Sequence, residues 1–232
     1  MAFLDFDYLI VSNGCFSEES LSHTLQLFSE LGIRKFIFTL DMDMNCHTFT
    51  RQRERLKLLQ ELVKPLRPRG VSFEVCTNLI MTEDVCYHPQ VSRLCVPHTN
   101  LLFLQLPYFT DENWIHVDLN HLLRKKRISP IFTSFQNNLR TNPPDMLERC
   151  LNSQCYRFAM DLNYLTALDS DMLLRRIVRE KIPVLPCISH DWSYYVGALA
   201  AFEQLRNSLD NWRYLHLCRI IRLSGQKLIS NL

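Results

Sequence analysis

The sequence predicts an α/β fold, in which parallel strands form a closed barrel and helices cover its outside. Short apolar runs rich in β-branched and aromatic residues recur along the 232 residues, and longer segments with helical spacing separate them. These runs are apolar on both faces, a pattern typical of parallel strands covered by helices. The alternation therefore favours a barrel, with an open doubly wound sheet as the alternative.

Each predicted strand is a short apolar run bounded by polar or turn-forming residues. The runs are Tyr8–Val11, Lys35–Thr39, Ser72–Thr77, Leu101–Leu106, Pro130–Thr133, Tyr156–Met160 and Pro183–Ile188. About seven such units suffice for a TIM-like (β/α)7 barrel of parallel strands with outer helices. No linker interrupts the pattern, so we expect one domain over residues 1–232.

Start and stop signals delimit the intervening helices. Ser17 and Ser20 favour a helix start, and Gly32 favours its end after Leu31. Further helices are predicted from Thr48 to the prolines Pro65 and Pro68, from about Asp111 to the basic run Arg124–Arg127, over Tyr195–Leu209 and over Asn211–Leu223. The segment 82–100 lacks periodicity, and we expect it to be an excursion over one end of the barrel.

Composition excludes several classes of function. Apolar residues make up 47% of the sequence and charged residues 22%, as in an ordinary globular protein. A formal net charge of +2 provides no general field for collecting nucleic acid or anionic lipid. No apolar run is long enough to span a bilayer. We therefore expect no nucleic-acid partner and no membrane span.

The cysteines indicate a reducing compartment. Nine cysteines are scattered along the chain without a CxxC pair, and several lie inside apolar runs. The first residues lack the pattern of a signal peptide. A cytoplasmic location is the expectation.

Common catalytic motifs are absent. The sequence contains no GxGxxG, no GxxxxGK and no GxSxG. A phosphatase loop with five residues between its cysteine and arginine is also missing, although Cys46 and Arg51 come within one residue of that spacing. Dinucleotide binding, P-loop chemistry and thiol-based phosphatase chemistry therefore have no support.

In a parallel barrel, functional residues gather in the loops after the carboxyl ends of the strands. The candidate binding residues in those loops are Asn13, Asp41, Asp43, His47, Asn78, Ser134, Gln136, Asn137, Arg140, Asp161, His190 and Asp191. Carboxylates and imidazoles among them could bind a divalent metal, whereas ordinary loop solvation explains the same polarity. Cys187 is close to His190 and Asp191, but a triad rarely has members adjacent in sequence.

The order of segments resembles the PHP-type (polymerase and histidinol phosphatase) family, nearest to the bacterial capsule-biosynthesis tyrosine phosphatases, which are metal-dependent. The resemblance runs from Asp7 to about Leu209. It rests on Glu18–Leu21, Gly32–Thr39, Leu101–Tyr108, Ser129–Thr133 and Pro183–Ile188. It implies a barrel with metal ions held by histidines and acids at the strand ends.

Those ligand positions look replaced in this sequence. The family's first-strand HxH corresponds to Leu9-Ile10-Val11, and its paired histidines after the second strand fall near Asp41 and Met42. The other positions correspond to Asn78 or Leu79, to Ser134–Asn137, and to Ser189 and Asp191. We expect no metal cofactor, with Asp41, His190 and Asp191 as the residues that could still ligate one ion.

Two functional hypotheses follow from the resemblance, besides an unrelated barrel with a similar order of segments. The favoured one is a catalytically degenerate homologue, a pseudo-enzyme that binds a phosphorylated or glycan-related ligand or a protein partner in capsule or exopolysaccharide regulation. The alternative is an active metal-dependent phosphatase that uses manganese or another divalent metal at a site rebuilt around Asp41, Asp43, His47, His190 and Asp191.

The degenerate site is expected to remain a concavity at the mouth of the barrel. Arg140 is its predicted anion contact, because a guanidinium forms paired hydrogen bonds with phosphate or carboxylate. The opposite expectation is a mouth closed by large side chains, namely Phe135, Met42, Met44 and Trp192.

Overall fold

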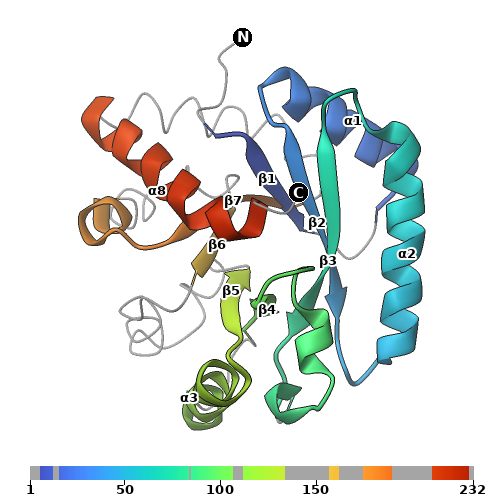
Figure 1. Ribbon diagram of the computed structural model, residues 1–232, viewed down its shortest axis with the longest axis vertical. Helices are drawn as coiled ribbons and strands as arrows, with labels where there is room; N and C mark the ends of the chain where they lie inside the picture. The colour runs from blue at the N-terminus through green and yellow to red at the C-terminus, as the bar shows by residue number, and fades with distance from the viewer. Residues whose placement is uncertain are drawn as a thin grey trace.

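A closed barrel of seven parallel strands forms the centre of the molecule (Figure 1). The computed structural model describes residues 6–12, 16–83, 85–106, 112–133, 157–161, 175–189 and 211–229. The strands are β1 (Tyr8–Ser12), β2 (Lys35–Met42), β3 (Ser72–Ile80), β4 (Leu101–Gln105), β5 (Ser129–Thr133), β6 (Arg157–Asp161) and β7 (Val184–Ser189). Each strand pairs with the next along the chain, and β7 pairs with β1. The predicted barrel and all of its predicted strands are confirmed.

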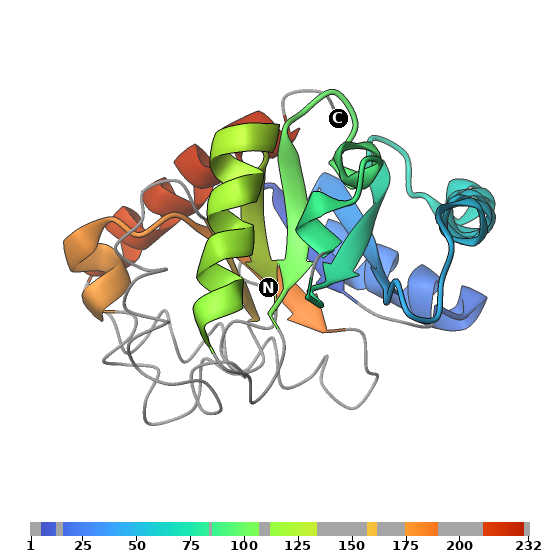
Figure 2. The same ribbon diagram turned by 90° about the horizontal axis from the view of Figure 1, so that it is seen from below.

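Helices surround the strands (Figure 2). They are α1 (Glu18–Glu30), α2 (Phe49–Leu66), α3 (Glu112–His121), which continues into the π-helical turn η3 (Leu122–Lys126), and α8 (Asn211–Ile229). Residues 175–180 are also helical. Within the described ranges, no helix combines the length and the hydropathy needed to cross a membrane.

The predicted capping signals act as expected at the start of α1 and α2. The Ser17 hydroxyl accepts a hydrogen bond from the Ser20 backbone N–H in a capping box, and Thr48 caps α2 in a similar way. Gly32 follows α1 with φ +102°, a conformation that glycine adopts without strain. One boundary differs, because Pro65 lies inside the last turn of α2 instead of ending the helix.

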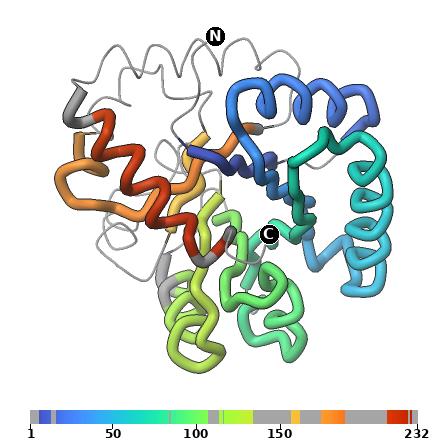
Figure 3. The backbone as a smooth tube through the Cα atoms, turned by 45° about the horizontal axis from the view of Figure 1, so that its top comes forward, coloured from blue at the N-terminus to red at the C-terminus, as the bar shows by residue number. Residues whose placement is uncertain are grey.

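The segment before β4 packs on the outside of the barrel, so the expected excursion over one end is wrong. It contains the short 3-10 helices η1 (Val85–Tyr87) and η2 (Val91–Leu94), and η1 packs against α3 (Figure 3). Val85, Cys86 and Val91 are buried. The segment therefore connects β3 to β4 in place of a crossover helix. Its apolar residues are buried although they do not recur with helical periodicity.

Helix α8 closes the amino-terminal end of the barrel. Figure 1 shows it lying across the strands, with its carboxyl-terminal end over their centre. The Tyr8 hydroxyl at the start of β1 donates a 2.8 Å hydrogen bond to the carbonyl of Ile221. Gly225 lies so close to Tyr8 that a Cβ there would be 2.5 Å from the ring. The predicted helix from Asn211 thus exists and extends to Ile229, and the predicted helix over Tyr195–Leu209 falls outside the described residues.

Candidate functional site

A hydrogen bond across the barrel identifies which side chains face its interior. The Thr133 hydroxyl on β5 donates to the Asn78 side-chain oxygen on β3, at 2.8 Å, although β4 lies between these two strands. Such a bond is possible only on the inner face of the barrel. Because paired residues of neighbouring strands point to the same side, Asp41 also faces the interior as the partner of Asn78.

The same alternation gives the orientation of the side chains of β1. Ser12 pairs with Thr39, and Ile10 pairs with Ile37, both of which share the inner face with Asp41. Leu9 and Val11 therefore point outward towards the helices. The inner positions of β1 are Tyr8, Ile10 and Ser12, and none of them carries an imidazole.

A polar network lies at the carboxyl ends of β2 to β5. The fully buried Asn78 donates from its side-chain nitrogen to the Asp41 carboxylate at 2.7 Å and to the Gln105 side-chain oxygen at 3.4 Å. With the bond from Thr133, every polar atom of the Asn78 side chain has a partner. The structure thus brings together two predicted site residues, Asp41 and Asn78.

Gln105 and Thr133 complete this network and were not predicted as site residues. Each is the last residue of its strand, directly after an apolar run. A polar residue at the end of a buried strand is the signal that could have identified them.

Burial raises the pKa of the Asp41 carboxyl, while the hydrogen bond from Asn78 and the nearby Arg55 charge act in the opposite direction. The Arg55 guanidinium donates to the Asp41 backbone carbonyl at 2.8 Å and to the Gln52 side-chain oxygen at 2.7 Å. Gln52 in turn donates to the Leu40 carbonyl at 3.2 Å. Helix α2 therefore fixes the end of β2, and Asp41 is held as a carboxyl with an increased tendency to keep its proton.

Asp43 and His47 lie in the turn between β2 and α2. The Asp43 carboxylate accepts from the Asn45 backbone N–H at 2.9 Å, and its carbonyl accepts from the His47 backbone N–H at 2.8 Å. Asp43 thus stabilises the turn itself. Among the residues that the structure describes, no group of three or more His, Cys, Asp or Glu side chains is placed to hold a metal ion. Asp41, Asp43 and His47 therefore do not form a metal site as a set.

Asp161 and Cys187 pair on neighbouring strands on another side of the barrel. Both are buried, and Cys187 also pairs with the inward-facing Ile10. Burial, with a smaller contribution from the Asp161 charge, raises the pKa of the Cys187 thiol well above its usual value. A thiol held in its neutral form is a poor nucleophile, so Cys187 is a core residue.

Several predicted site residues lie outside the described part of the chain, namely Asn13, Ser134, Gln136, Asn137, Arg140, His190 and Asp191. Phe135 and Trp192 do as well. Met42 is fully buried and follows the inward-facing Asp41, so its side chain lies on the outer face of β2 and does not close the mouth. The concavity around Arg140 stays a prediction.

Comparison with known proteins reveals a likeness in structure only. No protein-family model and no curated protein matches the sequence. A solved structure with a similar fold comes from the crystal structures of YwqE from Bacillus subtilis and CpsB from Streptococcus pneumoniae, described as unique metal-dependent tyrosine phosphatases. The TM-score is 0.62 at 13% sequence identity, over 90% of this chain and 88% of the other. The two chains thus share a fold over nearly their whole lengths.

Proposed function

We propose that this chain is a PHP-like phosphatase homologue that has lost metal-dependent catalysis. It acts by binding a phosphorylated or glycan-related ligand, or a protein partner, at the carboxyl-terminal mouth of its barrel. The observation that supports this proposal is the network around Asn78, in which the polar side chains at the strand ends bond to one another.

The described side chains do not fit a cluster of metal ions. Each ion of such a cluster takes about four to six ligands, and most of its charge must be neutralised. Among the strand-end residues that the structure describes, the carboxylates facing the interior are Asp41 and Asp161. One Asp41 oxygen already accepts a hydrogen bond from Asn78, and burial favours the neutral form of this carboxyl. A donor N–H therefore occupies one of the acceptor positions that a cation could use.

The polar side chains at the strand ends can still bind a ligand by hydrogen bonds. Amides both donate and accept hydrogen bonds, so the half-buried Gln105 matches the hydroxyls of a glycan or the oxygens of a phosphate ester, while the buried Asn78 bonds to its side-chain oxygen. The network is also rigid, because Asn78 and Thr133 are buried and hydrogen bonds join its members to one another. A rigid polar surface at the mouth of the barrel supports ligand binding without catalysis.

Metal analysis and turnover measurements test the loss of catalysis. Protein purified without chelator should contain no stoichiometric manganese, iron or zinc, and a phosphotyrosine mimic with added manganese should be hydrolysed little. Turnover that disappears in Asp41→Ala or Asp191→Ala would overturn the proposal. It would favour an active phosphatase, whose ligands would then have to include His190 and Asp191.

We also propose a cytoplasmic location and a role in capsule or exopolysaccharide regulation. The cysteines in the described ranges are free, and Cys76, Cys86, Cys187 and Cys218 are buried, which suits a reducing compartment. The link to capsule regulation rests on the PHP-type resemblance. Cell fractionation tests the first part, and capsule quantity in a deletion strain tests the second.

A further inference from the structure

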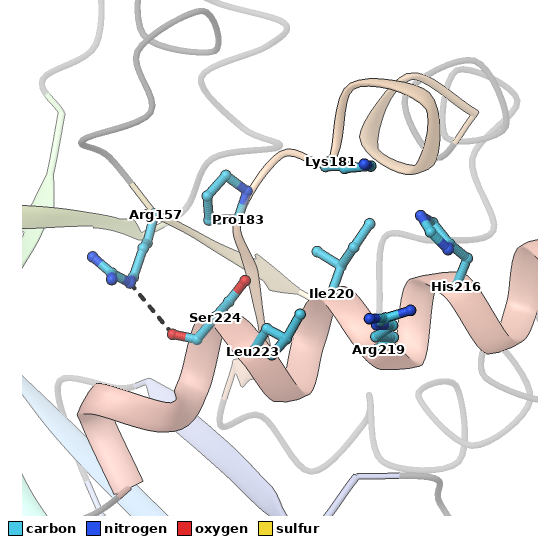
Figure 4. Close-up of a pocket in the computed structure, with 8 residues that line it drawn as sticks. All are labelled: Arg157, Lys181, Pro183, His216, Arg219, Ile220, Leu223 and Ser224. Carbon is cyan, nitrogen blue, oxygen red and sulfur yellow. Dashed lines mark hydrogen bonds between the residues drawn. The ribbon is translucent and has the colours of Figure 1, made fainter.

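A separate pocket lies at the opposite, amino-terminal side of the barrel. It has a volume of about 370 Å³ and is formed by the start of β6, the residues before β7 and one face of α8 (Figure 4). Its lining residues are Arg157, Lys181, Pro183, His216, Arg219, Ile220, Leu223 and Ser224. This volume lies within the usual range of small-molecule sites.

The described lining residues include Arg157, Lys181 and Arg219, and none of these described residues is acidic. The nearest acid along the chain, Glu180, already accepts from the guanidinium groups of Arg176 at 3.0 Å and Arg179 at 2.7 Å. Within the described residues, neither Lys181 nor Arg219 forms an ion pair with a carboxylate. The positive charge of these two side chains is therefore not neutralised by a described neighbour.

The cations reach the pocket from two walls. His216, Arg219, Ile220 and Leu223 lie on one face of α8, because residues three, four and seven positions apart share a helix face. Figure 4 shows Lys181 across from this face, with Pro183 and Ile220 between the charged groups and the barrel. A ligand between the walls would meet positive charge on both sides and apolar surface beneath.

Arg157 has a different role. Its guanidinium donates to the Ser224 carbonyl and to the Ser129 hydroxyl, both at 3.3 Å, and burial lowers its pKa. It holds α8 against the barrel and forms a fixed wall of the pocket. The cations that line the pocket opposite Arg157 are thus Lys181 and Arg219.

We propose that this pocket binds a small molecule that carries a phosphate or diphosphate joined to an apolar or aromatic ring. Lys181 and Arg219 bind the phosphate oxygens by charge-assisted hydrogen bonds, and Pro183, Ile220 and Leu223 contact the ring. The proposal is independent of the proposed function, because the two sites lie at opposite ends of the barrel.

The turn at Lys181 permits an informative variant. Lys181 follows the helical residues 175–180 with φ +56°, and the Ile182 N–H donates to the Ile177 carbonyl in the bond typical of a helix end. Glycine adopts this conformation more readily than lysine. Lys181→Gly therefore removes the cation while preserving or raising the melting temperature, so lost binding cannot result from unfolding.

Titration calorimetry of the full chain at constant ionic strength tests the proposal, with ADP as the probe and inorganic pyrophosphate for comparison. We expect saturable ADP binding, weakened about tenfold or more by Lys181→Gly and by Arg219→Ala. The matched control is Arg222→Ala, which removes an exposed cation from α8 outside the pocket and should leave the affinity unchanged.

Four results would overturn the proposal. They are no saturable binding at millimolar ADP, an affinity unaffected by Lys181→Gly and Arg219→Ala, an equal loss in Arg222→Ala, and pyrophosphate binding as tight as that of ADP. An equal loss in the control would indicate general attraction to a basic surface. Equal pyrophosphate binding would show that the apolar wall contributes nothing.

Discussion

Replacement of Asn78 by alanine should destabilise the barrel more than an ordinary surface change, because Asn78 bonds to three other side chains. Its side chain is 0% exposed, donates to Asp41 at 2.7 Å and accepts from Thr133 at 2.8 Å. In Asn78→Ala, the half-buried Asp41 carboxyl and the buried Thr133 hydroxyl each lose a partner. Losing a bond to a charged group together with a neutral one gives an expected cost of about 2 to 4 kcal/mol in the free energy of unfolding.

Guanidinium denaturation and thermal melting measure this cost. For a protein of this size, the expected loss corresponds to a decrease in melting temperature of roughly 4 to 16 °C. Thr133→Val is the matched control, because it removes only the bond to the Asn78 oxygen and nearly preserves volume. It should cost about 1 kcal/mol.

The pH dependence of the same variant tests the electrostatic part of the reasoning. The bond from Asn78 lowers the pKa of Asp41, so its loss should raise this pKa further above the ordinary value of 3.8. A carboxyl with a raised pKa in the folded state binds more protons than in the unfolded state, so stability falls as pH rises through this window. The deficit of Asn78→Ala should therefore grow from acidic to neutral pH. A stability within about 0.5 kcal/mol of wild type at neutral pH would refute the network as described.

Three further variants test the contacts inside the barrel and at its amino-terminal end. Gly225→Ala should lower the melting temperature by an amount corresponding to about 1 to 3 kcal/mol, because its Cβ would lie 2.5 Å from the buried Tyr8 ring. Helix propensity alone predicts the opposite, a more stable variant. Such a variant would contradict the close contact between Gly225 and Tyr8. Asp41→Asn keeps the oxygen that accepts from Asn78 and removes the carboxylate charge. Denaturation should therefore show the variant to be more stable than wild type near neutral pH, and this gain in stability should disappear below pH 3.8. A gain independent of pH would show that ionisation of Asp41 is not involved. Asn78→Asp places a second carboxyl beside Asp41 and should melt at a lower temperature at pH 8 than at pH 5; the opposite order would refute like-charge repulsion.

The fold was predictable because its signals are local. Strands of a parallel barrel are buried on both faces, so each appears as a continuous apolar run, and Ser17 and Thr48 mark helix starts by their own side chains. The segment 82–100 was misplaced because burial of its apolar residues depends on α3, which lies elsewhere in the sequence. Contacts of this kind leave no periodic pattern.

The site was only partly predictable, since its composition depends on strand register. Asp41 and Asn78 could be identified from their place near strand ends, but their hydrogen bond requires the pairing of β2 with β3. The orientation of the β1 side chains was equally hard to predict. Leu9, Ile10 and Val11 are all apolar and all buried, so their sequence does not reveal which of them faces the interior.

The interior network also limits the repulsion between charged groups at the strand ends. Carboxylates gathered at strand ends repel one another unless cations neutralise them. In this chain, Asn78, Gln105 and Thr133 supply neutral groups that satisfy one another and Asp41, so the described network contains a single carboxyl. That carboxyl has a raised pKa and can become neutral at little cost. The neutral partners of Asp41 therefore let these strand ends pack together without a second charge in the described network.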